Sequence, residues 1–156
     1  MHTTRSVDPV EASRLHRYRP GAAVHVVATT LPGTRAAMKA AAAMAKGVES
    51  RVRVIAARQV SADSSSGQQS ASARAFAQEI MQWPETRSSR ADVLPCLCKR
   101  LSDVAQLLTP QSVVVIGGRS RWWWASREQR LADTLTAEGH RVLFVSADEE
   151  PDIVPR

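Results

Sequence analysis

The sequence predicts an α/β domain, a three-layer α/β/α sandwich on a five-stranded parallel sheet. Five apolar runs alternate with four helical segments, an order typical of a parallel sheet with helices on both faces. In addition, residues 113–147 contain a strand pattern, a loop, an amphipathic helix and a second strand pattern. Open α/β sheets bind ligands at the loops that follow their strands, so this segment also predicts where a site lies.

The first βαβ unit opens the expected domain at residues 22–147. The run VHVVATT at residues 24–30 is apolar and β-branched, which is typical of a buried strand. An Ala-rich helix follows, with Thr34 as its expected N-cap and Gly47 as its stop. The alternating residues 51–57 predict a second strand, parallel to the first because a helix joins the two.

The middle of the chain predicts a loop, a helix and an edge strand. Residues 61–72 are polar and of low complexity, which indicates a surface loop. Residues 72–83 place apolar side chains at helical spacing, and Pro84 ends this helix. The third strand, at residues 92–98, contains Pro95, which cannot donate a ladder hydrogen bond, so we expect an edge position.

The last third of the domain predicts two strands and two helices. Residues 99–108 show a helical apolar face, and the continuous apolar run at residues 112–116 predicts a central fourth strand. Ser126 followed by Gln129 forms a capping box at the start of the last helix. Residues 141–145 are apolar and predict the fifth strand.

Composition limits the class of protein. The 156 residues carry a formal net charge of +6, with ten Arg or Lys against three Asp or Glu in the first sixty positions. Residues 1–21 predict a flexible basic arm, and residues 148–156 a C-terminal tail. No run approaches the roughly 18 apolar residues of a membrane span, so we expect a cytoplasmic protein. Cys96 and Cys98 are too few for a zinc site, and we expect two small buried residues.

Three stretches resemble the universal stress protein family. VHVVATTLPGTRAAMKAAAAMAK resembles its opening strand, loop and Ala-rich helix, VVVIGG resembles its fourth strand, and ASREQRLADTL with HRVLFV resembles its last helix and strand. The resemblance implies sheet order 3-2-1-4-5 in an adenine nucleotide alpha hydrolase-like fold. It also implies a homodimer through the last strand, here Val142 to Val145, and a regulatory or stress-response role.

The chain departs from the ATP-binding members of that family. Those members carry an Asp after the first strand, where this chain has Thr29. In their phosphate loop two residues separate the first two glycines, and nine more precede a Gly-Ser or Gly-Thr pair. Here Gly117 matches the first glycine, Ser120 replaces the second, and the pair Ala125-Ser126 arrives about five residues early. A shorter loop offers fewer N–H groups to a triphosphate, so we expect no bound cofactor.

The candidate ligand residues are Thr29, Gly117, Gly118, Arg119, Ser120, Arg121 and Ser126. The glycine pair either lets a ligand approach the backbone or only turns the chain off the strand. The two arginines either clamp a phosphate or are solvated charges. The serine caps a helix whose first N–H groups can bind an anion. An alternative function is therefore binding of ATP, ADP or another phosphate ligand through these arginines and the serine.

Trp122, Trp123 and Trp124 form the most unusual motif. Three consecutive tryptophans cannot all point into a core, so we expect at least one to be exposed, as an interface or a stacking surface. The neighbouring arginines and the basic arm make nucleic-acid binding a second alternative. No paired nucleophile and base and no metal-ligand spacing occur. We therefore expect no enzyme, but a homodimer that acts through protein contacts, including a regulatory partner at the tryptophans.

Overall fold

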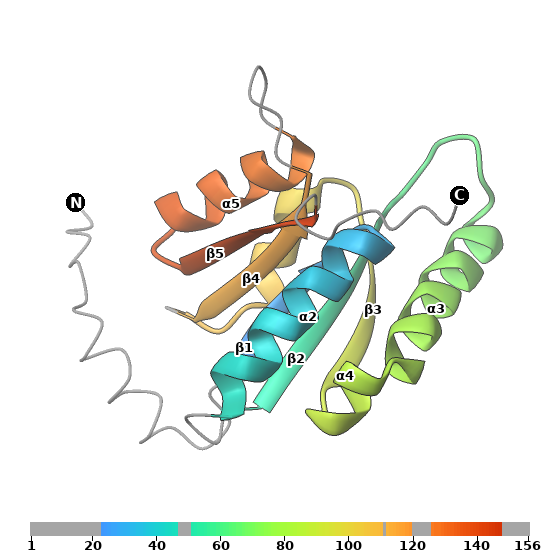
Figure 1. Cartoon of the computed structure of the whole chain (residues 1–156). Helices are drawn as coiled ribbons and strands as arrows, with labels where there is room; N and C mark the ends of the chain where they lie inside the picture. Colours follow the sequence, from blue (N-terminus) through green and yellow to red (C-terminus); the bar gives the residue numbers. More distant parts are fainter. Residues whose placement is uncertain (1–22, 47–50, 111, 120–125, 148–156) are drawn as a thin grey trace, which may run out of the picture.

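The computed structural model describes residues 23–46, 51–110, 112–119 and 126–147. Its strands are β1 (Ala23–Ala28), β2 (Arg51–Gln59), β3 (Asp92–Cys98), β4 (Val113–Gly118) and β5 (Arg141–Ser146). Its helices are α2 (Leu31–Lys46), α3 (Ser66–Gln82), α4 (Pro84–Ser88), the 3₁₀ helix η1 (Leu101–Leu107) and α5 (Arg127–Ala137). The predicted alternation of strands and helices is confirmed (Figure 1).

All five strands are parallel, in the order β3-β2-β1-β4-β5. The predicted order, the central position of β4 and the edge position of β3 are therefore confirmed. The amide of Val60 donates to the carbonyl oxygen of Cys98 (2.8 Å), so the backbone groups of Cys98 point toward β2. Pro95 lies three residues earlier. Because backbone groups point to alternate sides along a strand, those of Pro95 point away from β2. The missing N–H of Pro95 thus lies on the open side of the edge strand, where it costs no ladder hydrogen bond.

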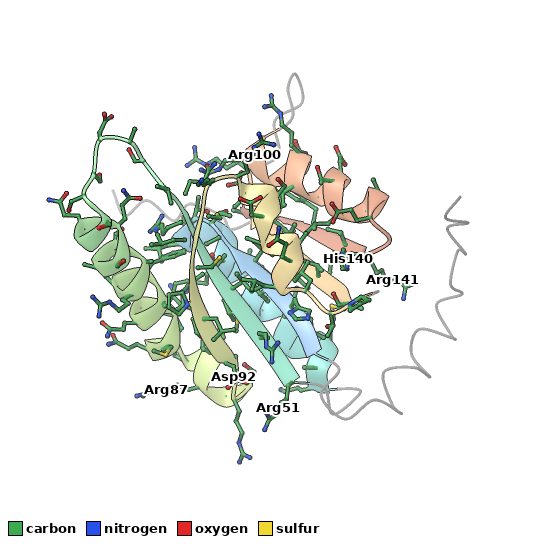
Figure 2. The ribbon with its side chains drawn as sticks, turned by 180° about the vertical axis from the view of Figure 1, so that it is seen from behind. Arg51, Arg87, Asp92, Arg100, His140 and Arg141 are labelled. Atoms are coloured by element: carbon green, nitrogen blue, oxygen red, sulfur yellow. The ribbon has the colours of Figure 1, made fainter. Side chains whose placement is uncertain are left out.

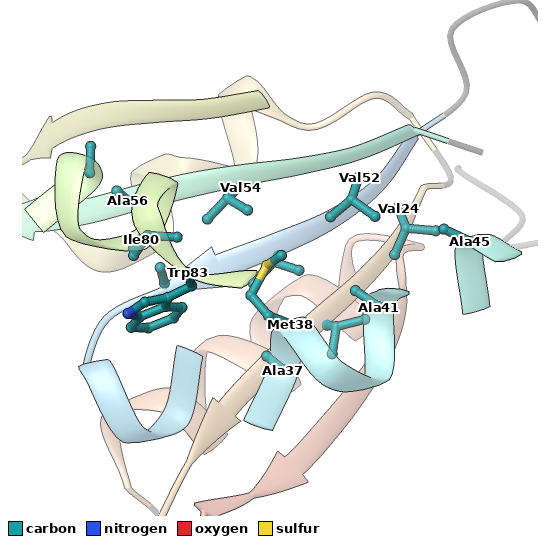
Figure 3. Close-up of a cluster of buried hydrophobic side chains, with 14 of the residues drawn as sticks. Val24, Ala37, Met38, Ala41, Ala45, Val52, Val54, Ala56, Ile80 and Trp83 are labelled. Atoms are coloured by element: carbon teal, nitrogen blue, oxygen red, sulfur yellow. The ribbon is translucent and has the colours of Figure 1, made fainter. Parts of the chain in front are cut away.

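Two apolar clusters hold the helices against the two faces of the sheet. On one face, α2 and α3 cover alternate residues of β1 and β2, and the cluster includes Val24, Val54, Met38, Ile80 and Trp83 (Figure 3). On the other face, η1 and α5 cover the intervening residues, and that cluster includes Val27, Ile55, Val104, Ile116 and Leu135. Adjacent strand residues enter opposite clusters because side chains alternate along a strand. The result is a three-layer arrangement.

A buried histidine ties the loop after η1 to the centre of the sheet. His25 is 0% exposed, and its Nε2 lies 2.9 Å from the hydroxyl of Thr109. On β1 it alternates with Val24 and Val26, so it shares the η1 face with Val27. A polar ring at such depth is tolerated when it is hydrogen-bonded.

The structure corrects the predicted starts of two helices. α2 begins at Leu31, and Thr30 caps it by accepting a hydrogen bond from the amide of Gly33 (3.3 Å). Thr34 lies inside the helix, and its hydroxyl donates back to the carbonyl of Thr30. The prediction failed because two threonines with the same capping chemistry stand four residues apart, and the choice between them depends on packing.

α3 also begins earlier than predicted. Ser65 and Gln68 form a reciprocal capping box, so half of the segment predicted as a loop at residues 61–72 is helical. The hydrophobic pattern did not indicate this start, because the first turns of α3 contain serine and glutamine and no apolar face. Ser65 and Gln68 nevertheless supply the cap. Pro84, predicted only as the end of this helix, is also the first residue of the short helix α4.

The remaining corrections concern η1 and β4. The segment predicted as a helix at residues 99–108 is a 3₁₀ helix of seven residues, Leu101–Leu107. β4 continues through Gly117 and Gly118, two residues beyond the apolar run that predicted it. Both glycines pair with β5, opposite Val145 and Ser146. No helix in the described part of the chain is long and apolar enough to cross a membrane.

Candidate functional site

The C-terminal ends of the strands, here called the carboxyl edge, gather polar residues from distant parts of the chain. Thr29 follows β1, Arg58 and Gln59 end β2, and Arg119 follows β4. The first turn of α5 starts at this edge as well. Figure 2 shows Arg100, which follows β3, at the opposite end of the sheet from Arg51 and Asp92.

Gly33 and Gly117 bring the first turn of α2 into backbone contact with the end of β4. A Cβ on Gly33 would lie 2.7 Å from the carbonyl carbon of Gly117, and a Cβ on Gly117 would overlap the carbonyl oxygen of Gly33. β1 and β4 are the neighbours whose following helices pass to opposite faces, which is where doubly wound proteins bind ligands. In this protein, backbone atoms of the chain itself pack together at that point.

Gly118 lets α5 approach β4 closely, as Gly117 does for α2. A Cβ there would lie 2.9 Å from the Cβ of Glu128 in the first turn of α5. Gly117 and Gly118 are therefore approached closely by other parts of the chain, α2 at the first and α5 at the second. Whether a ligand also approaches them stays a prediction.

A buried carboxylate lies between β1 and α5. Thr29, 2% exposed, donates its hydroxyl hydrogen bond to Oε1 of Glu128 (2.9 Å), which is itself 7% exposed. The first turn of a helix carries partial positive charge, and this favours a negative side chain. Glu128 thus places an acidic side chain of the chain itself at this helix end, where a bound anion was one alternative in the sequence analysis.

Ser126 is fully engaged as the N-cap of α5. Its hydroxyl accepts the amide of Gln129 (3.1 Å), and the Gln129 side chain accepts the amide of Ser126 (3.1 Å). The predicted capping box is therefore confirmed. Because these groups already use one another, the amide of Gln129 is not free to bind a phosphate.

Arg127 spans the edge from α5 to β2. Its Nη1 donates to Oε1 of Gln59 (2.9 Å), and its Nε lies 3.5 Å from Oε1 of Glu128. Both contacts fix the guanidinium above the end of the sheet, although about half of the side chain is exposed. An ion pair this exposed adds little stability by itself, so its main effect is orientation.

Arg58 is the second guanidinium at this edge. It lies 3.9 Å from the ring centroid of Phe76 in α3, a cation–π contact. Its Nε is buried without a hydrogen-bond partner within the described residues. Burial, and then the nearby charge of Arg127, lower the pKa of Arg58 from its ordinary value.

The other predicted residues divide into two groups. Arg119 is exposed directly after β4, and Val142 and Val145 are half-buried in the two apolar clusters of their own chain. Ser120, Arg121, Trp122, Trp123 and Trp124 lie outside the described residues, as do the arm and tail.

Four residues at this edge were not predicted as site residues: Arg58, Gln59, Arg127 and Glu128. The signal for the last of these was its place two residues after a capping serine, in the turn where an acidic side chain is favoured. The described residues contain no group of three or more side chains arranged to hold a metal ion.

Cys96 and Cys98 lie on the η1 face of the edge strand, the first half-buried and the second buried. Burial raises the pKa of both thiols, and the charge of Asp103 raises them further. A thiol whose pKa is higher in the folded state holds its proton there more tightly. Its contribution to stability is complete below the ordinary value of 9.0 and is lost as pH rises through the folded value.

We therefore expect alkaline destabilisation that depends on these thiols. Urea midpoints measured from about pH 8 to about pH 10.5 should fall more steeply for the wild type than for the double variant Cys96→Ala/Cys98→Ala. The single variant Cys96→Ala should lie between them. Equal slopes for all three proteins would show that the thiols do not titrate differently on folding.

No protein-family model matches this chain, and no curated protein matches it. The interpretation of the site therefore depends on the geometry of its own residues.

Proposed function

We propose that this protein is a universal stress protein-like regulator of the adenine nucleotide alpha hydrolase-like fold. In this proposal it acts without catalysis, as a cytoplasmic homodimer and through protein contacts, and has no site for a nucleotide between β1 and β4. The sheet order supports the fold proposal, because 3-2-1-4-5 is the order that the sequence resemblance implies.

One observation carries the proposal for the site. Gly33 and Gly117 meet backbone to backbone at the end of β4, the place where a nucleotide would need to enter between α2 and the strand. Beside them, Glu128 presents a buried negative charge. A triphosphate meets steric exclusion at the first feature and repulsion at the second.

The test compares ATP with inorganic tripolyphosphate by isothermal titration. A nucleotide site recognises base and ribose, so it binds ATP more tightly than tripolyphosphate, whereas a merely cationic surface binds the two alike. We expect no preference for ATP and no heat from adenosine at millimolar concentration. A preference for ATP of tenfold or more, about 1.4 kcal/mol, would contradict the proposal and favour the alternative based on Arg119, Arg121 and Ser126.

The homodimer proposal rests on the asymmetry of the two sheet edges. Pro95 disrupts pairing along β3, whereas β5 contains no proline and carries Leu143, which is 44% exposed. An open edge strand with an exposed leucine is a surface that a second copy can cover. Val142 and Val145 would support such an interface from within, since they pack on the core.

Replacing Leu143 with lysine should therefore give a monomer. Light scattering coupled to size-exclusion chromatography should show a dimeric wild type and a Leu143→Lys variant of half its mass. Leu94, equally exposed on the other edge strand, provides the matched control, and Leu94→Lys should remain dimeric. A monomeric wild type at micromolar concentration would refute the homodimer.

A further inference from the structure

The N-terminal ends of the strands, here called the amino edge, collect exposed arginines from separate elements. Arg51 is the first residue of β2, Arg141 is the first of β5, and Arg87 belongs to α4, which precedes β3. All three side chains are exposed. Figure 2 labels them, away from Arg100 at the carboxyl edge. The fold thus brings to one end of the sheet arginines that are far apart in the sequence.

The strand register fixes how far this surface extends. Arg51 pairs with Ala23 at the start of β1, and Arg141 pairs with Val113 at the start of β4. Because β1 and β4 are themselves neighbours, three strand spacings separate the two arginines, roughly 14 Å. The positive groups therefore extend across the width of the sheet.

Other charges at the amino edge leave it basic. Lys46 ends α2 and Arg90 lies between α4 and β3, so both add exposed positive charge there. The acids at this end are Glu85, Asp92 and Glu138. Positive side chains therefore outnumber negative ones at this edge of the described structure.

The guanidinium groups of this edge are free to bind a ligand. Arg51, Arg87 and Arg141 form no side-chain hydrogen bond or ion pair with any residue that the structure describes. Arg53 is half-buried in an interior strand, opposite Asp92 in register, yet no ion pair joins the two. Arginine is the side chain whose parallel N–H groups match two phosphate oxygens at once.

The segment before β1 adds charge to the same edge. Arg14, Arg17 and Arg19 precede Ala23 in the sequence, and β1 begins at the amino edge. The four residues from Arg19 to Ala23 span at most about 14 Å of chain. Chain connectivity therefore keeps further positive charge near this surface.

We propose that the amino edge binds the phosphate backbone of double-stranded nucleic acid. A duplex carries one negative charge for about every 1.7 Å of its axis, so arginines spread across the sheet can each contact a different phosphate. Such contacts position a protein on a duplex without reading its bases. Single strands are bound largely by stacking on aromatic side chains, and no aromatic side chain of the described residues is exposed.

This surface does not depend on the proposed function. It lies at the opposite end of the sheet from Arg119, which follows β4. The nucleic-acid alternative drawn from the sequence relies on the tryptophan motif and the basic arm, whereas this surface consists of arginines in β2, α4 and β5.

Fluorescence anisotropy with the full chain and a labelled DNA duplex of about 20 base pairs tests the proposal. The logarithm of the affinity should fall with the logarithm of the salt concentration with a slope of about −4 or steeper. The triple variant Arg51→Gln/Arg87→Gln/Arg141→Gln should weaken binding by about thirtyfold or more at 0.1 M salt and make the slope shallower by about 3. Each single variant should weaken binding about threefold and change the slope by about 1, which keeps the test decisive if the triple variant does not fold.

A second triple variant controls for net charge. Arg74→Gln/Arg100→Gln/Arg130→Gln removes the same charge from exposed positions in α3, after β3 and in α5, and should weaken binding less than about threefold. Equal losses in the two triple variants, or no binding of the duplex at about 50 mM salt, would overturn the proposal. Tighter binding of a single strand of the same length would also overturn it. Polyglutamate of equal charge that binds as tightly as the duplex would overturn it in favour of an acidic protein partner.

Discussion

Replacing Gly117 with alanine should destabilise the protein by about 3 kcal/mol or more. The new Cβ would overlap the carbonyl oxygen of Gly33. The obstacle is backbone rather than a flexible side chain, so either α2 or the end of β4 must move. Thermal unfolding followed by circular dichroism should show a melting temperature lower by roughly 6–12 °C.

Gly67 offers a control for the substitution itself. It lies in the first turn of α3, and a Cβ there meets nothing within 4 Å. Gly67→Ala should therefore cost nothing and add up to about 0.5 kcal/mol, since alanine has fewer unfolded conformations to lose. A Gly117→Ala protein as stable as Gly67→Ala would mean that α2 does not rest on β4 as described, and the main argument against a nucleotide site would fail.

The sheet was predictable because its determinants are local. Strand runs, the alternation with helices and the turn-forming residues all lie within a few positions of one another. Pro95 alone placed its strand at an edge, and Ser126 with Gln129 fixed the start of the last helix. Each of these signals requires only its immediate neighbours in the sequence.

The site was not predictable, because its contacts join residues far apart in the chain. Glu128 acquires its role from Thr29, ninety-nine positions away. Gly33 lies in the first turn of α2, where its immediate neighbours in the sequence do not require a glycine. Its packing against the backbone of Gly117 does require one. The sequence predicts a site at the crossover after β4, and that stays a prediction. The packing of α2 on the end of β4 has no local signal in the sequence, because it joins Gly33 to Gly117.

Glu128→Ala should have the second large effect, because it removes the carboxylate and leaves the buried hydroxyl of Thr29 without its acceptor. The expected loss is about 1–3 kcal/mol. Thr29→Val should cost a similar amount, since it leaves a buried carboxylate with one hydrogen bond fewer. Urea unfolding should give a double variant whose loss is smaller than the sum of the two, by about 1–2 kcal/mol, if the 2.9 Å hydrogen bond is the source of both losses. Additive losses would show that each residue acts separately.

The same variant tests whether the chain supplies its own anion at the start of α5. Removing the charge of Glu128 exposes the positive end of the helix, so the affinity for tripolyphosphate should rise by about tenfold. Glu79→Ala, at an exposed position of α3, changes the net charge equally and should raise it less than twofold. Glu128 is 7% exposed in the wild type. A gain in tripolyphosphate affinity that occurs in Glu128→Ala and not in Glu79→Ala would therefore come from the buried carboxylate at the helix end, and not from a general change in net charge. Equal affinities for Glu128→Ala and the wild type would mean that Glu128 only holds α5 against β1.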